Sequence, residues 1–412
     1  MGVKNLLKYL RERNEAIVQR FELKELAGYR IAVDNAVLTY QYKSQYISMN
    51  SGKINLFKET VDYAKATEYM IKKIMELISQ ILIAGVCPVM VFDGKAPALK
   101  NGTKKDRIAK SDKKKMRIAN LKRLGLALCD NAAYPISEED VAFLRSFKKP
   151  IMTVGDIEKR LEIETNGFIV ISADDQRQLQ VILTAMGVPW LIAESEAEKT
   201  CSIMARRRDV VAVFTTDSDC LMYGCPIMIN EITYRSSARI PVPPTCQCYS
   251  FINVLQVMEL TESQFIDFCV ISGTDFNPNP KGFGSATIYE LLKYFGTIRN
   301  IIKAQPVLRQ AQAINPWLKL NKIEKLLDKF DATVLNYDEV RCFLSWPVAY
   351  DVKLLEITHQ EVTVAQNRLV EVCGGEVFKG IQELVVKIMT RLRSFTLKPV
   401  ERIHLQQNSV SK

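Results

Sequence analysis

Histidine is nearly absent from this sequence, which has only His359 and His404 among its 412 residues. Zinc sites are built mainly from cysteine and histidine, and the ten cysteines here are scattered without zinc-site spacing. A Cys/His metal site is therefore not expected. We interpret the cysteines as reduced thiols of an intracellular protein.

Long hydrophobic runs are also missing. No segment is long and apolar enough to span a membrane, and no secretory signal opens the chain. Met1-Gly2 suggests N-myristoylation, but Leu6 stands where that signal requires Ser or Thr. We therefore expect no membrane partner. No internal repeat or low-complexity tract is found in the sequence.

What the chain has in excess is positive charge. The net charge is +10 and the isoelectric point about 9.0, which favours anionic partners such as nucleic acid. An apolar fraction of 48% and a charged fraction of 25% are those of an ordinary globular protein. A chain of this length forms one elaborated domain or two.

Three apolar segments, each leading into an aspartate, are predicted to be buried strands. They cover residues 29–34, 87–93 and 210–214, and the aspartates at or just beyond their carboxyl ends are Asp34, Asp93 and Asp217. A helical segment over residues 64–84 separates the first two. Strands alternating with helices predict an α/β fold with a largely parallel sheet flanked by helices. Such sheets place ligands at the carboxyl ends of their strands, so the three aspartates are expected on one edge.

More acidic residues lie close to the third strand. Glu196 and Glu198 open an Ala-rich segment expected to be helical, and Asp219 follows Asp217. Clustered carboxylates raise one another's pKa unless a cation neutralises them, and oxygen-only ligands favour magnesium or manganese over zinc. The alternative is a capping box followed by a solvated loop. Together with the three strand ends, these acids favour a metal site.

The segment after Asp93 is strongly basic. Between Lys100 and Arg123 there are eleven Lys or Arg residues against two Asp, interleaved with Ala and Leu. A cationic helix is predicted, and its usual interpretation is a solvated face or a localisation signal. Because this segment directly follows a strand-end carboxylate, we favour contact with phosphate. Further along, Gly282-Phe283-Gly284 opens a predicted helix at 286–294, an arrangement that presents backbone amides to phosphate but is weak evidence alone.

Six motifs occur in the order and rough spacing of a known family. They are Met1-Gly2-Val3-Lys4-Asn5-Leu6, Val33-Asp34, Val91-Phe92-Asp93-Gly94-Lys95, Ser195-Glu196-Ala197-Glu198, Thr216-Asp217-Ser218-Asp219-Cys220-Leu221 and Ser272-Gly273-Thr274-Asp275-Phe276. On these motifs the chain resembles the flap endonuclease family, within the XPG-type superfamily of structure-specific 5′ nucleases, from residue 1 to about 395. It looks divergent, and a viral origin is one interpretation. The resemblance implies a mixed, largely parallel sheet beneath a helical arch.

The resemblance also implies two divalent metals, Mg²⁺ with Mn²⁺ as a substitute. The carboxylates matching the family's ligands are Asp34, Asp93, Glu196 and Glu198 around the first metal and Asp217, Asp219 and Asp275 at the second. Two metals activate a water and stabilise the leaving oxygen in phosphodiester hydrolysis, without a histidine general base. All seven positions are acidic, which argues against a non-catalytic scaffold.

Several DNA contacts are implied in the same way. Lys100 and Arg107 match the catalytic basic pair that steers the scissile phosphate, and Tyr40 matches the aromatic that stacks beside the scissile bond; without the family, a core tyrosine is the preferred interpretation of Tyr40. The remaining matches are Gly2, near the active site, and Gly273, Lys281, Gly282 and Gly284, around the helix–two-turn–helix element. That element binds downstream duplex, often with a K⁺ ion.

The chain also departs from the family. Ser285-Ala286-Thr287 replaces the usual Pro, Lys and Arg, and Ile47 and Leu77 stand where well-known members have arginine. The region between Asp93 and Glu196 is longer than typical, around residues 126–165, which either enlarges the arch or forms an outer cap. Leu392 and Phe395 retain part of a sliding-clamp peptide, although a terminal turn packed on the body explains them equally well.

On this resemblance we divide the chain into four regions. They are an N-terminal nuclease region (1–100), a basic arch or cap insertion (101–170), an internal nuclease region (171–340) with the helix–two-turn–helix element near 273–295, and a C-terminal helical extension and tail (341–412). The expected function is that of a monomeric 5′ flap endonuclease and 5′–3′ exonuclease acting on flap, branched or nicked DNA, in the nucleus or a viral replication compartment. The alternatives are a Holliday-junction or bubble endonuclease, a 5′ exonuclease, or a non-catalytic DNA-binding factor.

Overall fold

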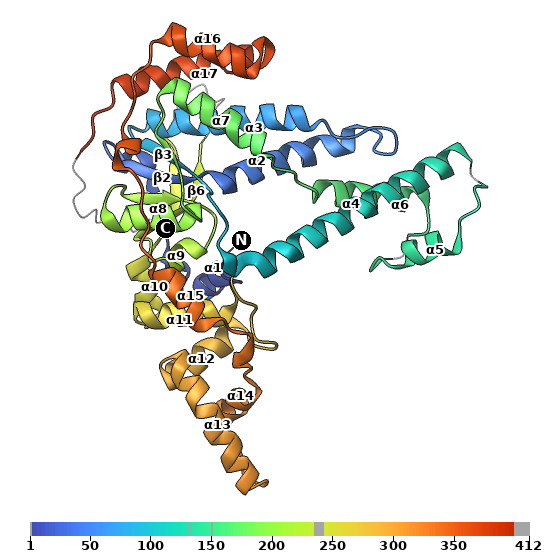
Figure 1. The fold of residues 1–412 in the computed structure, drawn as a ribbon, viewed down its shortest axis with the longest axis vertical. Coiled ribbons are helices and arrows are strands. Elements are labelled where there is room, and N and C mark those ends of the chain that lie inside the picture. Colours follow the sequence, from blue (N-terminus) through green and yellow to red (C-terminus); the bar gives the residue numbers. More distant parts are fainter. Residues whose placement is uncertain (1, 132, 150, 235–242, 399–412) are drawn as a thin grey trace.

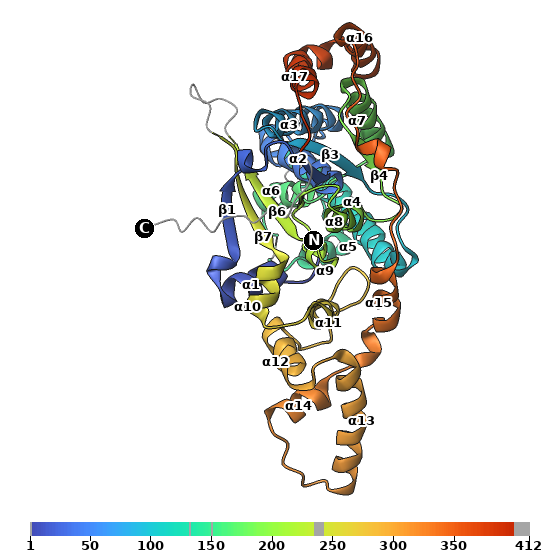
Figure 2. The ribbon, with the colours of Figure 1, turned by 90° about the vertical axis from the view of Figure 1, so that its left-hand side faces the viewer.

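The computed structural model describes residues 2–131, 133–149, 151–234 and 243–398. A central body carries three projections (Figure 1). The arm built from α4, α5 and α6 leaves one side of the body. The α12–α14 lobe and the α16–α17 pair lie at opposite ends of the molecule, as a second view also shows (Figure 2). Among the described helices, none combines the length and hydropathy that a membrane span requires.

The body is built on one seven-stranded sheet with the order β1-β7-β6-β5-β2-β3-β4. Its strands are β1 (Val18–Glu22), β2 (Arg30–Asp34), β3 (Cys87–Phe92), β4 (Trp190–Ile192), β5 (Ala212–Phe214), β6 (Ile227–Thr233) and β7 (Thr245–Ser250). The run from β6 to β4 is parallel, whereas β7 pairs antiparallel with both β6 and β1. The predicted mixed, largely parallel sheet is therefore confirmed.

Helices cover both faces of the sheet. The α-helices are α1 (Leu6–Arg13), α2 (Asn35–Asn50), α3 (Tyr63–Ile83), α4 (Asn101–Asp130), α5 (Glu138–Arg145), α6 (Val154–Asn166), α7 (Ala173–Met186), α8 (Ala197–Arg207), α9 (Asp219–Met222), α10 (Phe251–Met258), α11 (Glu262–Ser272), α12 (Ser285–Phe295), α13 (Ile298–Ile314), α14 (Lys322–Lys329), α15 (Tyr337–Ser345), α16 (Val362–Cys373) and α17 (Gly375–Arg393). Short 3₁₀ helices are η1 (Glu15–Ile17), η2 (Leu23–Leu26), η3 (Ser51–Lys53), η4 (Ala98–Lys100), η5 (Ala332–Val334) and η6 (Val352–Leu355).

Two cores lie on the two faces of the sheet. Alternate residues of a strand point to opposite faces, and Ile31 and Val33 of β2 enter the core beneath α2, α3 and α7, whereas Ala32 enters the core with α8 and α11. Leu77 of α3 is fully buried in the first of these cores. Leu77 therefore stabilises the fold, and its position offers no surface to DNA.

The arm has a separate core of its own. Leu121 and Leu124 of α4, Leu144 of α5 and Leu161 of α6 pack together with Ile47 at the outer part of α2. Residues 126–165 thus cover the end of α4, all of α5 and most of α6, at the outer end of the arm (Figure 1). The residues predicted to form an arch or cap insertion thus build a packed outer end, and Ile47 belongs to its core.

The C-terminal helices return to the body. α17 packs on α3 and α16 packs on α7, and Leu392 near the end of α17 is buried in the core. The predicted boundary between residues 340 and 341 falls inside α15. Val340 and Phe343, on either side of it, lie in the same core as residues of α11–α14. The tail from residue 399 lies outside the described residues.

Candidate metal centre

Three of the predicted acidic residues stand at the carboxyl ends of neighbouring parallel strands. Asp34 is the last residue of β2, Asp93 directly follows β3, and Asp217 comes just after β5. Because β2 pairs in parallel with both β3 and β5, the carboxyl ends of the three strands, and the aspartates there, lie at one edge of the sheet. Asp34 also caps α2, since its Oδ1 accepts a hydrogen bond of 3.1 Å from the Ala36 amide.

Two helix N-termini bring further carboxylates to this edge. Glu196 is the N-cap residue of α8, Glu198 lies in the first turn of α8, and Asp219 begins α9. Carboxylate oxygens of Glu198, Asp217 and Asp219 all lie within 4.8 Å of one another, and the three residues are buried. The structure therefore contains a buried acidic cluster with the dimensions of a metal site.

Burial makes this cluster electrostatically unfavourable without a cation. Burial first, and then the neighbouring Asp217, raise the pKa of Asp219 well above its ordinary value. Burial followed by the charges of Glu196 and Asp34 does the same for the pKa of Glu198. The pKa of Asp34 is raised to about 7, again mainly by burial and then by Asp93.

The donor set fits a hard divalent cation. Both carboxylate oxygens of Asp219 are buried without a hydrogen-bond partner, although buried polar atoms in folded proteins are nearly always paired. Every ligand atom in the cluster is a carboxylate oxygen, the type preferred by Mg²⁺ and Mn²⁺. A cation bound to these oxygens would both satisfy Asp219 and remove the repulsion.

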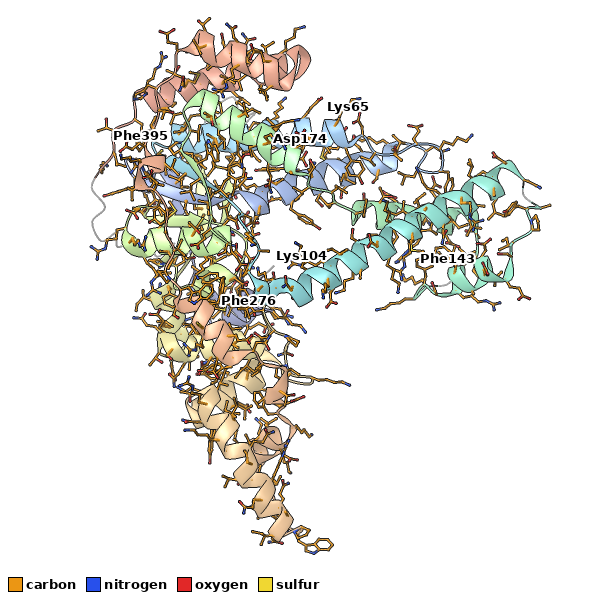
Figure 3. The ribbon with its side chains drawn as sticks, in the orientation of Figure 1. Lys65, Lys104, Phe143, Asp174, Phe276 and Phe395 are labelled. Carbon is orange, nitrogen blue, oxygen red and sulfur yellow. The ribbon has the colours of Figure 1, made fainter. Side chains whose placement is uncertain are left out.

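The base of α4 is docked onto the acidic edge. The Lys100 ammonium pairs with Glu196 and lies 3.9 Å from a Glu198 oxygen and 3.3 Å from an Asp275 oxygen. Arg107 Nη2 lies 2.6 Å from the same Asp275 oxygen. Although burial acts against each ion, these pairs raise the pKa of Lys100 and lower that of Asp275. Figure 3 labels Lys104 on the first part of α4, where that helix leaves the body.

The N-terminal segment is packed into the site. Gly2 has φ of +85°, and a Cβ built on it would lie 2.1 Å from Asp217 Oδ1, so only glycine fits. The Lys4 amide donates a 3.1 Å hydrogen bond to the Gly273 carbonyl, and the Ser218 hydroxyl donates to the Val3 carbonyl at 3.3 Å. The first residues of the chain thus connect the Asp217 loop to the end of α11.

Tyr40 projects from α2 with 44% of its surface exposed. A core tyrosine at this position, the interpretation preferred without the family, is therefore wrong. The first turn of α2 is fixed by Asp34 at its N-cap, so the helix that carries Tyr40 starts in the acidic cluster.

The helix–two-turn–helix element was predicted near residues 273–295. In the structure this range holds the loop 273–284 and α12, and α11 precedes it. Lys281, Gly282 and Gly284 are exposed on this loop, and φ of +88° at Gly282 favours glycine. Gly284 is the N-cap residue of α12 and provides no side-chain cap, which leaves the first amides of α12 available to a ligand.

Three hydroxyl-bearing side chains near the carboxylates had not been singled out in the sequence. Thr215 Oγ1 donates a 2.8 Å hydrogen bond to Asp34, Tyr223 OH donates a 2.6 Å bond to Glu196, and Ser218 holds Val3. Ser218 adjoins Asp217 in the sequence and Thr215 lies two residues before it, so their closeness to the acidic motif is a signal for both. Tyr223 lies beyond the motif, and only the fold brings it to Glu196.

Comparison with known families finds two matching regions. Residues 1–114 match the XPG N-terminal domain and residues 187–275 match the XPG I-region. Flap endonuclease 1 of Lodderomyces elongisporus is 28% identical over 304 residues, which cover 74% of this chain and 68% of the relative. Flap endonuclease 1 of Danio rerio is 26% identical over 303 residues, covering 74% of this chain and 69% of the relative.

Comparison with solved structures gives the same fold. The catalytic core of Rad2 in complex with DNA substrate superposes with a TM-score of 0.62 at 17% identity, covering 94% of this chain and all of that one. Flap endonuclease-1 from Methanococcus jannaschii gives 0.54 at 19% identity, covering 92% and 97%. Human GEN1 in complex with Holliday junction DNA gives 0.54 at 17% identity, covering 95% and 78%.

These findings agree with the acidic edge, the docked basic helix and the mixed sheet. The two matched regions contain all seven predicted carboxylates, two within residues 1–114 and five within residues 187–275, where Asp275 is the last matched residue. The chain belongs to the XPG-type family of 5′ nucleases.

Proposed function

We propose that this protein is a structure-specific 5′ flap endonuclease with 5′–3′ exonuclease activity. The observation that carries the proposal is the buried cluster of Glu198, Asp217 and Asp219 with the basic α4 docked over it. The relatives named flap endonuclease 1 support the reaction, and the DNA complexes of Rad2 and GEN1 support DNA as the partner. A purely DNA-binding role has no use for clustered negative charge facing phosphates.

Two Mg²⁺ ions are the proposed cofactors, and Mn²⁺ can replace them. Asp34, Asp93, Glu196 and Glu198 would hold one ion, and Asp217, Asp219 and Asp275 the other, with some ligands acting through water. When bound, such ions neutralise phosphate charge and activate water for in-line displacement. Thr215 and the Ala197 amide orient Asp34 and Asp93, through hydrogen bonds of 2.8 and 2.9 Å.

The basic pair at the start of α4 contributes positive charge on the DNA side. Lys100 and Arg107 both reach Asp275, and this supports a contact of their cationic groups with the scissile phosphate at the carboxylates. In that position they orient the phosphate and stabilise its developing charge. The exposed ring of Tyr40 stacks on the base beside the scissile bond, since base–aromatic stacking tolerates any sequence.

Duplex DNA is held away from the reacting phosphate. Lys281 and the loop amides around Gly282 and Gly284 contact the downstream backbone, with a K⁺ ion held by carbonyls near Gly273. The protein acts as a monomer where DNA is replicated, in the nucleus or a viral replication compartment. We do not propose a sliding-clamp contact through Leu392 and Phe395, because the Leu392 side chain of α17 is buried in the core of the body.

A cleavage assay tests the proposal. Labelled 5′ flap, bubble, Holliday junction and nicked duplex DNA are incubated with Mg²⁺ or EDTA, and the flap is expected to be cut fastest, only with Mg²⁺. Asp217→Ala and Glu196→Ala should each abolish cleavage while DNA binding stays within a few-fold of the wild type. Preferred cutting of the junction or bubble would reassign the substrate, and cleavage by either variant would refute the site.

A further inference from the structure

The carboxylates of the metal centre differ in how many of their oxygens are already engaged. Both oxygens of Asp34 accept hydrogen bonds, from Thr215 and from the Ala36 amide. Both oxygens of Asp219 lack a partner. Glu196 is divided, because Oε2 accepts a bond from Tyr223 and Oε1 pairs with the Lys100 ammonium. One oxygen of Glu196 therefore faces a cation while the other is fixed by the protein.

The residue that fixes Glu196 is itself rigidly placed. Tyr223 is 4% exposed and is the C-cap residue of α9, where its amide donates a 3.0 Å hydrogen bond to the Asp219 carbonyl. Its hydroxyl donates the 2.6 Å bond to Glu196 Oε2 across to α8. The backbone turn of α9 and the hydrogen bond to α8 thus hold the Tyr223 ring at both ends.

We infer that Tyr223 is a positioning residue of the metal centre, which holds Glu196 Oε2 so that Oε1 is presented to the divalent cation. The inference rests on the proposed function, since it gives Glu196 the role of a metal ligand. The geometry supports it in two ways. First, among the described residues the one cationic side chain paired with Glu196, that of Lys100, contacts Oε1. Second, α9 carries both Asp219 and Tyr223, so this short helix positions Asp219 directly and Glu196 through the Tyr223 hydroxyl.

Tyr223→Phe removes the hydroxyl and keeps the ring. Binding of Mn²⁺ to the DNA-free protein, measured by electron paramagnetic resonance, is expected to weaken about tenfold or more, as for other residues that orient a metal ligand. Tyr249→Phe is the matched control. Tyr249 is also fully buried, but its hydroxyl accepts a 2.7 Å bond from Arg11 and touches none of the acidic residues. The control should bind Mn²⁺ like the wild type.

Kinetics provide a readout that general loss of structure would not reproduce. The KM for flap DNA of Tyr223→Phe should equal that of the wild type, whereas the Mg²⁺ concentration at half-maximal rate should rise about tenfold. In a Glu196→Gln background, Tyr223→Phe should cause no further loss of Mn²⁺ affinity, because both changes act through the same carboxylate.

The outcomes separate the inference from the proposed function. Equal Mn²⁺ affinity of Tyr223→Phe and wild type overturns the inference while leaving the nuclease proposal intact. The inference is also overturned if Tyr223→Phe and Tyr249→Phe lose the same Mn²⁺ affinity, or if Tyr223→Phe still lowers Mn²⁺ affinity in the Glu196→Gln background. Either result would mean that the loss of affinity comes from altered packing. A wild-type protein that binds no divalent cation removes the proposed function itself.

Discussion

At the scale of single residues, we expect the geometry of the metal centre to depend on the close packing of the N-terminal segment against the acidic cluster. We expect Gly2→Ala to displace either this segment or the Asp217 side chain, because its Cβ would lie 2.1 Å from Asp217 Oδ1 at a φ of +85°. Displacing one ligand by about 1 Å can reduce a rate about a hundredfold. A flap-cleavage assay with saturating Mg²⁺ measures the loss.

The control for this prediction is Gly380→Ala. Gly380 lies inside α17, and a Cβ there meets no atom within 4 Å, so alanine should leave cleavage unchanged and stabilise the helix by about 0.5–1 kcal/mol. If Gly2→Ala cleaves at the wild-type rate, the close packing of the N-terminus against Asp217 is not needed for activity.

At the scale of elements, α4 consists of two unlike halves. Its outer half packs against α6 through Leu121 and Leu124, whereas residues 104–113 are exposed on every side. An exposed helix of this kind has no apolar stripe, and its lysines face solvent in all directions. The inner half, with five Lys or Arg residues against two Asp between residues 104 and 113, therefore offers an excess of positive charge on the part of α4 nearer the body.

Removing charge from the inner half of α4 should reduce the salt dependence of DNA binding. Each phosphate contact contributes a slope of about 0.9 in log K against log salt concentration. We expect the triple variant Lys105→Gln, Lys110→Gln, Lys113→Gln to lower the slope by roughly 2–3. Fluorescence anisotropy of flap DNA over a salt series measures it.

An equally exposed set of lysines serves as the control. Lys24, Lys65 and Lys387 have side-chain exposures of 61, 66 and 54% and lie on η2, α3 and α17, outside α4. Their replacement by Gln changes the net charge by the same amount and should leave the slope nearly unchanged. Similar slopes for the two variants would mean that net charge, and not α4, attracts the DNA.

At the scale of the whole molecule, the buried carboxylates should make the metal-free protein less stable as the pH rises. The pKa of Asp34 is about 7 in the folded chain against an ordinary 3.8, so between these values the folded state binds more protons than the unfolded state. The free energy of unfolding then falls with increasing pH. Glu198 and Asp219, whose pKa values are also raised, act in the same direction.

Thermal unfolding in EDTA at about pH 5, 6 and 7.5 tests this expectation. The Tm in EDTA should fall as the pH rises. Mg²⁺ should raise the Tm most at the highest pH, where the carboxylates are ionised. In EDTA, the Tm of Asp34→Asn should fall less with pH than that of the wild type. A metal-free Tm that rises steadily over the same range contradicts the account of the acidic cluster.

Much of the fold could be predicted because its signals are local. The buried strand over residues 87–92 and the helix over 64–84 were predicted within a residue or two, since continuous apolar runs and helical periodicity show in a short window. β1 and β7 were missed. Their sequences, Val-Gln-Arg-Phe-Glu and Thr-Cys-Gln-Cys-Tyr-Ser, are half polar, and they are strands because they pair with each other and with β6.

The sequence by itself determined the acidic positions, because aspartates ending parallel strands must meet at one edge of the sheet. The motifs also identified the family, which the comparisons confirm. Only the tertiary structure decided that Tyr223 fixes Glu196, that Gly2 packs on Asp217, and that Ile47 and Leu77 are core residues. Contacts between residues far apart in the chain follow from packing, and no local pattern of residues encodes them.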